Sequence, residues 1–138
     1  MSAFTDPKLT LLELLEGEWQ ISSDPVFIAD WPDEKTKYPV VTVFHLATNI
    51  KPTGFSDNVP SADRRHMGEY FVDVWSRGDS GERYALLKEV DRILKSRISE
   101  PPGGLEQIWT SGWVDLDEEQ LRPPIYRSRL RVKVLYYG

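Results

Sequence analysis

The chain has 138 residues, a formal net charge of −5 and a hydrophobic share of 40%, and it contains no cysteine. These values predict one domain, residues 1–138, with a buried core; they exclude wholesale disorder, disulfides and thiolate metal sites, and they argue against general nucleic-acid binding. No apolar run approaches the ~20 residues that a membrane helix requires, and the first residues do not resemble a secretion signal. We therefore expect a protein made inside the cell, with no membrane partner.

The first predicted element is a short helix over residues 7–16. Asp6 can cap it, Pro7 suits its first turn, and Gly17 follows its end. Its expected buried stripe consists of Leu9, Leu11, Leu12, Leu14 and Leu15.

Two strands are predicted next, at residues 26–29 and 40–47, on either side of a polar turn. We expect this pair to form a hairpin. Residues 48–67 have no sustained periodicity, which predicts a long loop of the kind that is usually functional or mobile. Its candidates for contacting a partner are Phe55, Val59, Arg64, Arg65, His66 and Met67.

A strand is predicted at residues 68–76, and both of its faces carry apolar or aromatic side chains. Asp73 lies in the middle of this strand, where a half-buried carboxylate needs a donor. A salt bridge to an arginine on a neighbouring strand is favoured over an active role.

The clearest helix is predicted at residues 80–98, because Asp79 and Glu82 form a capping box before an apolar stripe. Residues 101–104 end it with two prolines and two glycines. A further strand at residues 105–116 follows, where Gly112 predicts a bulge.

The last predicted strand begins at Tyr126 and alternates with a period of two, which gives it an apolar face and a cationic face. The cationic face consists of Arg127, Arg129, Arg131 and Lys133. Three interpretations stay open for it: an ordinary solvent face, a surface that meets acidic residues of a neighbouring subunit, or a phosphate-binding surface. The last is disfavoured because no stacking aromatics alternate with these cations on their face. We expect the four cations to contribute little to folding.

The order of these elements predicts an α+β fold with a mostly antiparallel sheet of four to five strands. The N-terminal helix and the one longer amphipathic helix are expected to pack on one face of that sheet.

No motif for catalysis or for a cofactor is found, so we expect neither enzymatic activity nor a cofactor. His45 is interpreted as a sheet-surface or interface residue and His66 as a solvated loop residue. The acidic turn lacks the pattern of a calcium loop, and a solvated turn is the favoured interpretation. Its carboxylates, which also suit a neighbouring subunit's cations, are Asp115, Asp117, Glu118 and Glu119.

Four segments together resemble the tail-completion, or tail-terminator, proteins of long-tailed viruses. They read Tyr-Pro-Val-Val-Thr-Val (38–43), Tyr-Phe-Val-Asp-Val-Trp-Ser (70–76), Leu-Leu-Lys-Glu-Val-Asp-Arg-Ile-Leu (86–94) and Tyr-Arg-Ser-Arg-Leu (126–130). The resemblance covers residues 7–137, and its most specific part is the strand that ends Asp-Val-Trp-Ser, followed by a short turn and an amphipathic helix.

The resemblance implies a structural subunit that forms a ring, commonly of six copies, at the head-proximal end of the tail. Its implied partners are other copies of itself, the tail-tube protein and a neck or head-completion protein, and DNA would pass transiently through the ring. Such a protein is assembled in the host cytoplasm and ends up in the virion. The alternatives are another neck or tail-tube component and a small non-viral module that binds a ligand or peptide.

Overall fold

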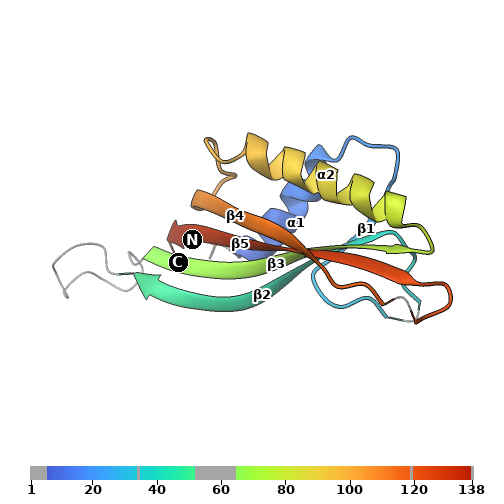
Figure 1. Ribbon diagram of the computed structural model, residues 1–138. Coiled ribbons are helices and arrows are strands. Elements are labelled where there is room, and N and C mark those ends of the chain that lie inside the picture. Colours follow the sequence, from blue (N-terminus) through green and yellow to red (C-terminus); the bar gives the residue numbers. More distant parts are fainter. Residues whose placement is uncertain (1–5, 34, 52–64, 119, 138) are drawn as a thin grey trace.

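The computed structural model describes residues 6–33, 35–51, 65–118 and 120–137 (Figure 1). The elements are α1 (Pro7–Glu18), β1 (Val26–Ile28), β2 (Val40–Lys51), β3 (Arg65–Arg77), α2 (Ser80–Ser96), β4 (Leu105–Asp115) and β5 (Ile125–Tyr137). The strands form one sheet in the order β1-β2-β3-β5-β4. Every neighbouring pair is antiparallel except β1 and β2, which confirms the predicted α+β fold.

The predicted hairpin between the first two strands is wrong, because β1 pairs with β2 in parallel. Val26 lies opposite Val40, and the Val26 backbone N–H donates to the Pro39 carbonyl at 3.0 Å. Parallel neighbours need a connection that returns to the start of the first strand, and residues 29–39 supply it. Within this connection, Trp31 lies against Phe44 of β2 and Trp75 of β3.

The predicted loop at residues 48–67 is also wrong at both of its ends. β2 continues to Lys51 and β3 already begins at Arg65, so that His66 lies opposite Ile50 and Met67 opposite Asn49. Backbone pairing holds these ends together without an apolar alternation, which is why the sequence pattern does not reveal them. Residues 52–64 lie outside the part of the chain that the structure describes.

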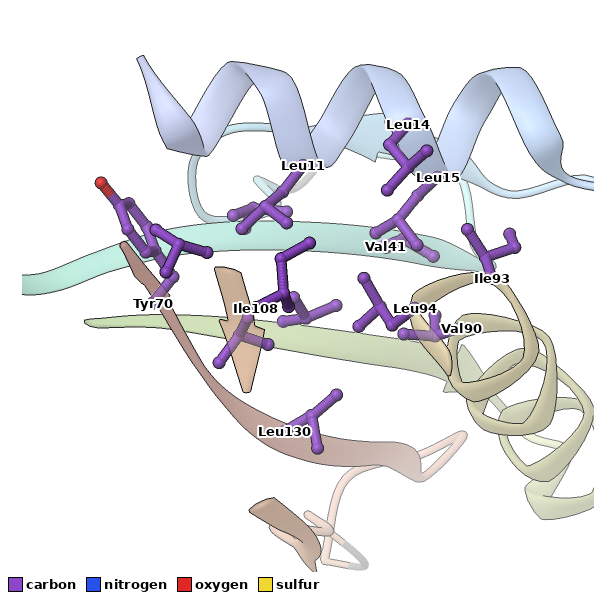
Figure 2. Packing of buried hydrophobic residues seen from close by; sticks show 14 of the residues in the cluster. Leu11, Leu14, Leu15, Val41, Tyr70, Val90, Ile93, Leu94, Ile108 and Leu130 are labelled. Atoms are coloured by element: carbon purple, nitrogen blue, oxygen red, sulfur yellow. The ribbon is translucent and has the colours of Figure 1, made fainter. Parts of the chain in front are cut away.

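Both helices cover the same face of the sheet, and the core lies between them and the strands (Figure 2). From α1, Leu11, Leu14 and Leu15 are buried, whereas Leu9 is 45% exposed because it lies on the opposite side of the helix. The predicted leucine stripe is therefore wrong at Leu9. The buried strand residues of the core are Val41, Val43, Tyr70, Val72, Val74, Leu105, Ile108, Leu130, Val132, Val134 and Tyr136.

The start of α2 shows one half of the predicted capping box, the Asp79 cap, whereas the Glu82 carboxylate has another partner. The Asp79 carboxylate accepts hydrogen bonds from the backbone N–H groups of Gly81 and Glu82, at 2.9 and 3.3 Å. The Glu82 carboxylate accepts from the Ser23 hydroxyl at 3.1 Å, so it ties the segment after α1 to the start of α2.

A buried carboxylate, Glu89, connects the two helices. It accepts from the Gln20 backbone N–H at 2.7 Å and from Arg92 at 2.8 Å, and Arg92 also donates to the Glu18 carbonyl. The hydrogen bonds from Arg92 hold the pKa of Glu89 below its ordinary value, although burial opposes this. The end of α1 is thus fixed to α2 by a charged contact in addition to apolar packing.

β5 has the two faces that the alternation predicts. Leu130, Val132 and Val134 are fully buried beneath the helices, and β5 lies between β3 and β4 in the sheet.

We expect Leu130→Ala and Val132→Ala each to lower the free energy of unfolding by about 1 to 4 kcal/mol, through lost burial and a residual cavity. Urea denaturation measures this. Val114→Ala, at a residue that is 58% exposed, is the control, and an equal loss there would contradict the assignment.

Glu89→Gln tests the contact between the helices. At neutral pH we expect a loss of about 1 to 3 kcal/mol, because the variant weakens hydrogen bonds to a charged group. The folded-state pKa of Glu89 is lowered, so the contribution is present above the ordinary carboxyl pKa and disappears as the pH falls through the folded value.

The difference between wild type and this variant should therefore shrink below about pH 4, as measured by urea denaturation at several pH values. The control is Glu100→Gln, at an exposed carboxylate after α2. A difference that does not change with pH would show that the Glu89 carboxylate does not contribute through its charge.

Candidate assembly surface

The sheet surface that faces away from α1 and α2 is called here the outer face. Because side chains alternate along a strand, the residues next to the buried ones point to this face. β5 contributes its four cations, and the register places Asp73 opposite Arg129, Phe71 opposite Arg131 and Trp109 opposite Lys133. Charged and aromatic side chains from three strands are thereby brought together.

The predicted salt bridge of Asp73 is confirmed. Asp73 is fully buried, and Arg129 donates to its two carboxylate oxygens through Nε at 2.9 and 3.3 Å and through Nη2 at 3.0 Å. Arg127 lies nearby, with its Nε 3.8 Å from Asp73. Burial raises the pKa of Asp73, while the hydrogen bonds and charge of Arg129 act to lower it.

Arg127 is enclosed by aromatic rings. Its guanidinium lies 4.6 Å from the centroid of the Trp75 ring and 5.3 Å from that of Trp31, and burial lowers the pKa of Arg127. The Nε of Arg127 is buried and has no hydrogen-bond partner among the residues that the structure describes, and the Trp75 indole donates to the Thr42 hydroxyl at 2.9 Å. Trp31 lies in the connection between β1 and β2, which the sequence pattern predicted to be a polar turn. The sequence therefore did not reveal its contact with Arg127.

The other two cations of β5, Arg131 and Lys133, are more exposed than Arg127 and Arg129. Arg131 and Lys133 have side chains that are 50% and 49% exposed, and both approach Glu69 on β3, at 3.2 and 3.4 Å. The expectation that all four cations contribute little to folding is therefore corrected for Arg127 and Arg129. They lie against a fully buried carboxylate, which the alternation of β5 alone does not reveal.

Aromatic side chains do lie among these cations, contrary to the sequence-based expectation. The Arg129 guanidinium lies 4.2 Å from the centroid of the Phe71 ring, and Trp109, which is 43% exposed, pairs with Lys133. These rings belong to the neighbouring strands β3 and β4, so the alternation of β5 could not show them.

A hollow of about 430 Å³ opens on the outer face where β3, β5 and β4 lie side by side. Trp109 forms an apolar wall, and the exposed ends of Arg131 and Lys133 form the charged side. Its lining residues are Met67, Trp109, Thr110, Ser111, Arg131 and Lys133. Ser111 belongs to the bulge predicted at Gly112, and the structure confirms that bulge as a register shift between Thr110 and Trp113.

The acidic turn is used within the chain. Asp117 pairs with Arg83 of α2 and accepts from the Arg127 backbone N–H at 3.0 Å, while Asp115 accepts from the Ser128 hydroxyl at 2.7 Å. Glu118 is exposed and its backbone bridges to Ile125. Glu119 lies outside the described residues. Two of the four predicted interface carboxylates are thus already partnered.

The two histidines lie on neighbouring strands and contact different groups. His45 is exposed, with its Nε2 at 2.6 Å from the Thr48 hydroxyl. His66 lies within β3, where its ring stacks on Tyr136 with the centroids 5.3 Å apart, so the prediction of a solvated loop residue is wrong. Within the described ranges, no group of three or more His, Asp or Glu side chains could hold a metal ion.

Of the remaining residues predicted to contact a partner, three lie outside the described part of the chain and two lie within β3. Phe55, Val59 and Arg64 lie outside the part of the chain that the structure describes, Arg65 is the first residue of β3, and Met67 lines the hollow. No helix in the described part is long and apolar enough to cross a membrane.

No family model and no curated protein matches this sequence. Among solved structures, the fold is similar to that of a chain in the structure "Virion of native gene transfer agent (GTA) particle", with a TM-score of 0.53 and 13% sequence identity. The similarity covers 92% of this chain and 84% of that chain, so it includes nearly the whole arrangement of helices and strands.

The buried ion pair gives a direct test. Arg129→Ser leaves Asp73 buried without its main partner, so we expect a loss of about 3 to 5 kcal/mol in the free energy of unfolding. Arg131→Ser, at a half-exposed cation, should cost at most ~1 kcal/mol. The paired replacement Asp73→Leu with Arg129→Met should recover most of the loss. Equal effects of the two serine variants in urea denaturation would show that the Asp73 pair does not stabilise the fold.

Proposed function

We propose that this chain is a structural protein of a virus-like particle. The observation that carries the proposal is the fold, which is similar over most of both chains to a chain from a gene transfer agent virion. The low identity of 13% means that this support comes from the arrangement of elements and not from shared residues.

Within such a particle, the proposed role is that of a tail terminator. Copies of the chain form a ring, with six the copy number implied by the resemblance, at the head-proximal end of the tail. The ring stops growth of the tail tube and joins the tail to a neck or head-completion protein, and DNA passes through it. The four-segment resemblance, which includes the strand-to-helix connection Asp73–Ser80, supports this finer role.

The outer face also supports assembly. It combines half-exposed cations with an exposed Trp109, and aromatic and arginine side chains are enriched where proteins meet. A ring uses two different patches on each subunit, and such patches must be complementary without being alike.

We also propose that the chain is not an enzyme, with no cofactor. The polar groups of the outer face are engaged in ion pairs with one another, and His45 and His66 each contact a hydroxyl or a ring. The alternative functions are another neck or tail-tube component, and a small module that binds a ligand in the hollow beside Trp109.

Particles made with and without this chain distinguish these functions. A tail terminator predicts that purified particles contain the chain at the junction of head and tail, visible by electron microscopy as a ring. It also predicts that particles made without it have tails of irregular length and no attached heads. Tails of normal length without heads would assign the chain to the neck. Absence of the chain from purified particles would contradict a structural role.

A further inference from the structure

We propose that the hollow on the outer face receives helix α1 of a second copy of this chain. The proposal rests on the proposed function as a homomeric assembly, and it names the two surfaces that meet. They are the hollow between β3, β5 and β4, and the side of α1 that faces away from the core.

The exposed side of α1 is defined by three residues. Leu9, Glu13 and Glu16 are spaced at i, i+4 and i+7, which places them on one side of the helix, opposite the buried Leu11, Leu14 and Leu15. Leu9 is 45% exposed. Glu13 and Glu16 are exposed, and neither has an ion-pair partner within the described part of the chain.

The hollow complements this side of α1, because it has an apolar wall and a cationic side. Trp109 supplies an apolar wall against which a leucine side chain can pack, and Arg131 and Lys133 lie at the charged side of the hollow. In the ion pairs of the described residues, the four cations of β5 share the two carboxylates Asp73 and Glu69, and the two cations beside the hollow share Glu69 alone.

The spacing of the two surfaces also agrees. Along a helix, Glu13 and Glu16 lie about 6 and 10 Å beyond Leu9, and on a strand Arg131 and Lys133 are about 7 Å apart. With Leu9 against Trp109, both carboxylates are within reach of the two long cationic side chains.

Two other occupants fit less well. The exposed side of α2 carries Lys88, Arg92 and Lys95 at the same helical spacing, so it would meet the cations of the hollow with like charge. Nucleic acid is disfavoured because the net charge of the chain is −5, which repels the phosphate backbone. A second copy offers both an apolar side chain, Leu9, and two exposed carboxylates, Glu13 and Glu16.

The absence of cysteine from the natural chain makes the contact testable by disulfide trapping. One full-length copy carries Leu9→Cys and the other carries Ser111→Cys, in the wall of the hollow. Mixed under mild oxidation, they should form linked dimers about tenfold faster than a mixture of Leu9→Cys with Lys88→Cys, the matched control on the cationic side of α2.

Charge reversal supplies the second measurement. Adding Glu13→Lys and Glu16→Lys to the Leu9→Cys copy should slow the trapping severalfold, and adding Arg131→Glu and Lys133→Glu to the Ser111→Cys copy should restore it. Circular dichroism and thermal midpoints confirm that each variant is folded. A chain that carries both cysteines should give a ladder of linked multimers, because its two sites lie on opposite faces of the sheet.

Trapping no faster than in the control, or unaffected by charge reversal, would overturn the contact. If sedimentation velocity then still shows self-association, the ring proposal stands with a different interface. If the chain is also absent from particles, the proposed function fails as well. Protection of Ser111→Cys from a thiol reagent by a duplex oligonucleotide, without trapping by Leu9→Cys, would show that nucleic acid occupies the outer face, and this too would overturn the proposal.

Discussion

The arrangement of the outer face depends on one buried carboxylate, Asp73. A carboxylate removed from water in the middle of a sheet is tolerated only when donors surround it, and Arg129 on the adjacent strand supplies three short contacts. Register shifts of one residue along β5 would turn Arg129 toward the core and expose Leu130, so the ion pair and the apolar face favour the same pairing of β3 with β5. The aromatic rings of Trp75 and Trp31 then enclose Arg127 beside it.

The ion pair of Asp73 with Arg129 also divides the four cations of β5 into two that are packed within the monomer and two that remain half exposed. Arg127 and Arg129 are held by Asp73 and by aromatic rings, so they belong to the packed structure of the monomer. Arg131 and Lys133 share a single carboxylate, Glu69, and remain half exposed. Each part has two cations for one carboxylate, but only the cations beside the hollow and Trp109 are half exposed, and the exposed carboxylates Glu13 and Glu16 lie on α1 at the opposite side of the sheet.

Much of the fold could be predicted because it follows local periodicity. The helices, the strand around Asp73, the bulge at Gly112 and the alternation of β5 all depend on residues close in sequence. The parallel pairing of β1 and the strand ends at Lys51 and Arg65 could not, because pairing partners and backbone hydrogen bonds leave no such pattern. The contacts of the outer face could not be predicted for a related reason. Phe71 and Trp109 reach the cations of β5 from neighbouring strands, and Trp31 reaches them from the connection between β1 and β2, so spacing along the chain gives no sign of these contacts.

The location of the two complementary surfaces also limits how copies can assemble. A patch on the helix side and a different patch on the outer face cannot form a closed two-fold dimer through one contact, since such a dimer joins a patch to itself. Each copy would instead contact one neighbour through α1 and another through the hollow, which produces a ring or an open helix according to the rotation between them. The 29–39 connection bears on that rotation, because Trp31 covers the other end of the outer face against Phe44 and Trp75. In the proposed contact, the neighbouring α1 lies at the end with Arg131 and Lys133, where the hollow beside Trp109 opens.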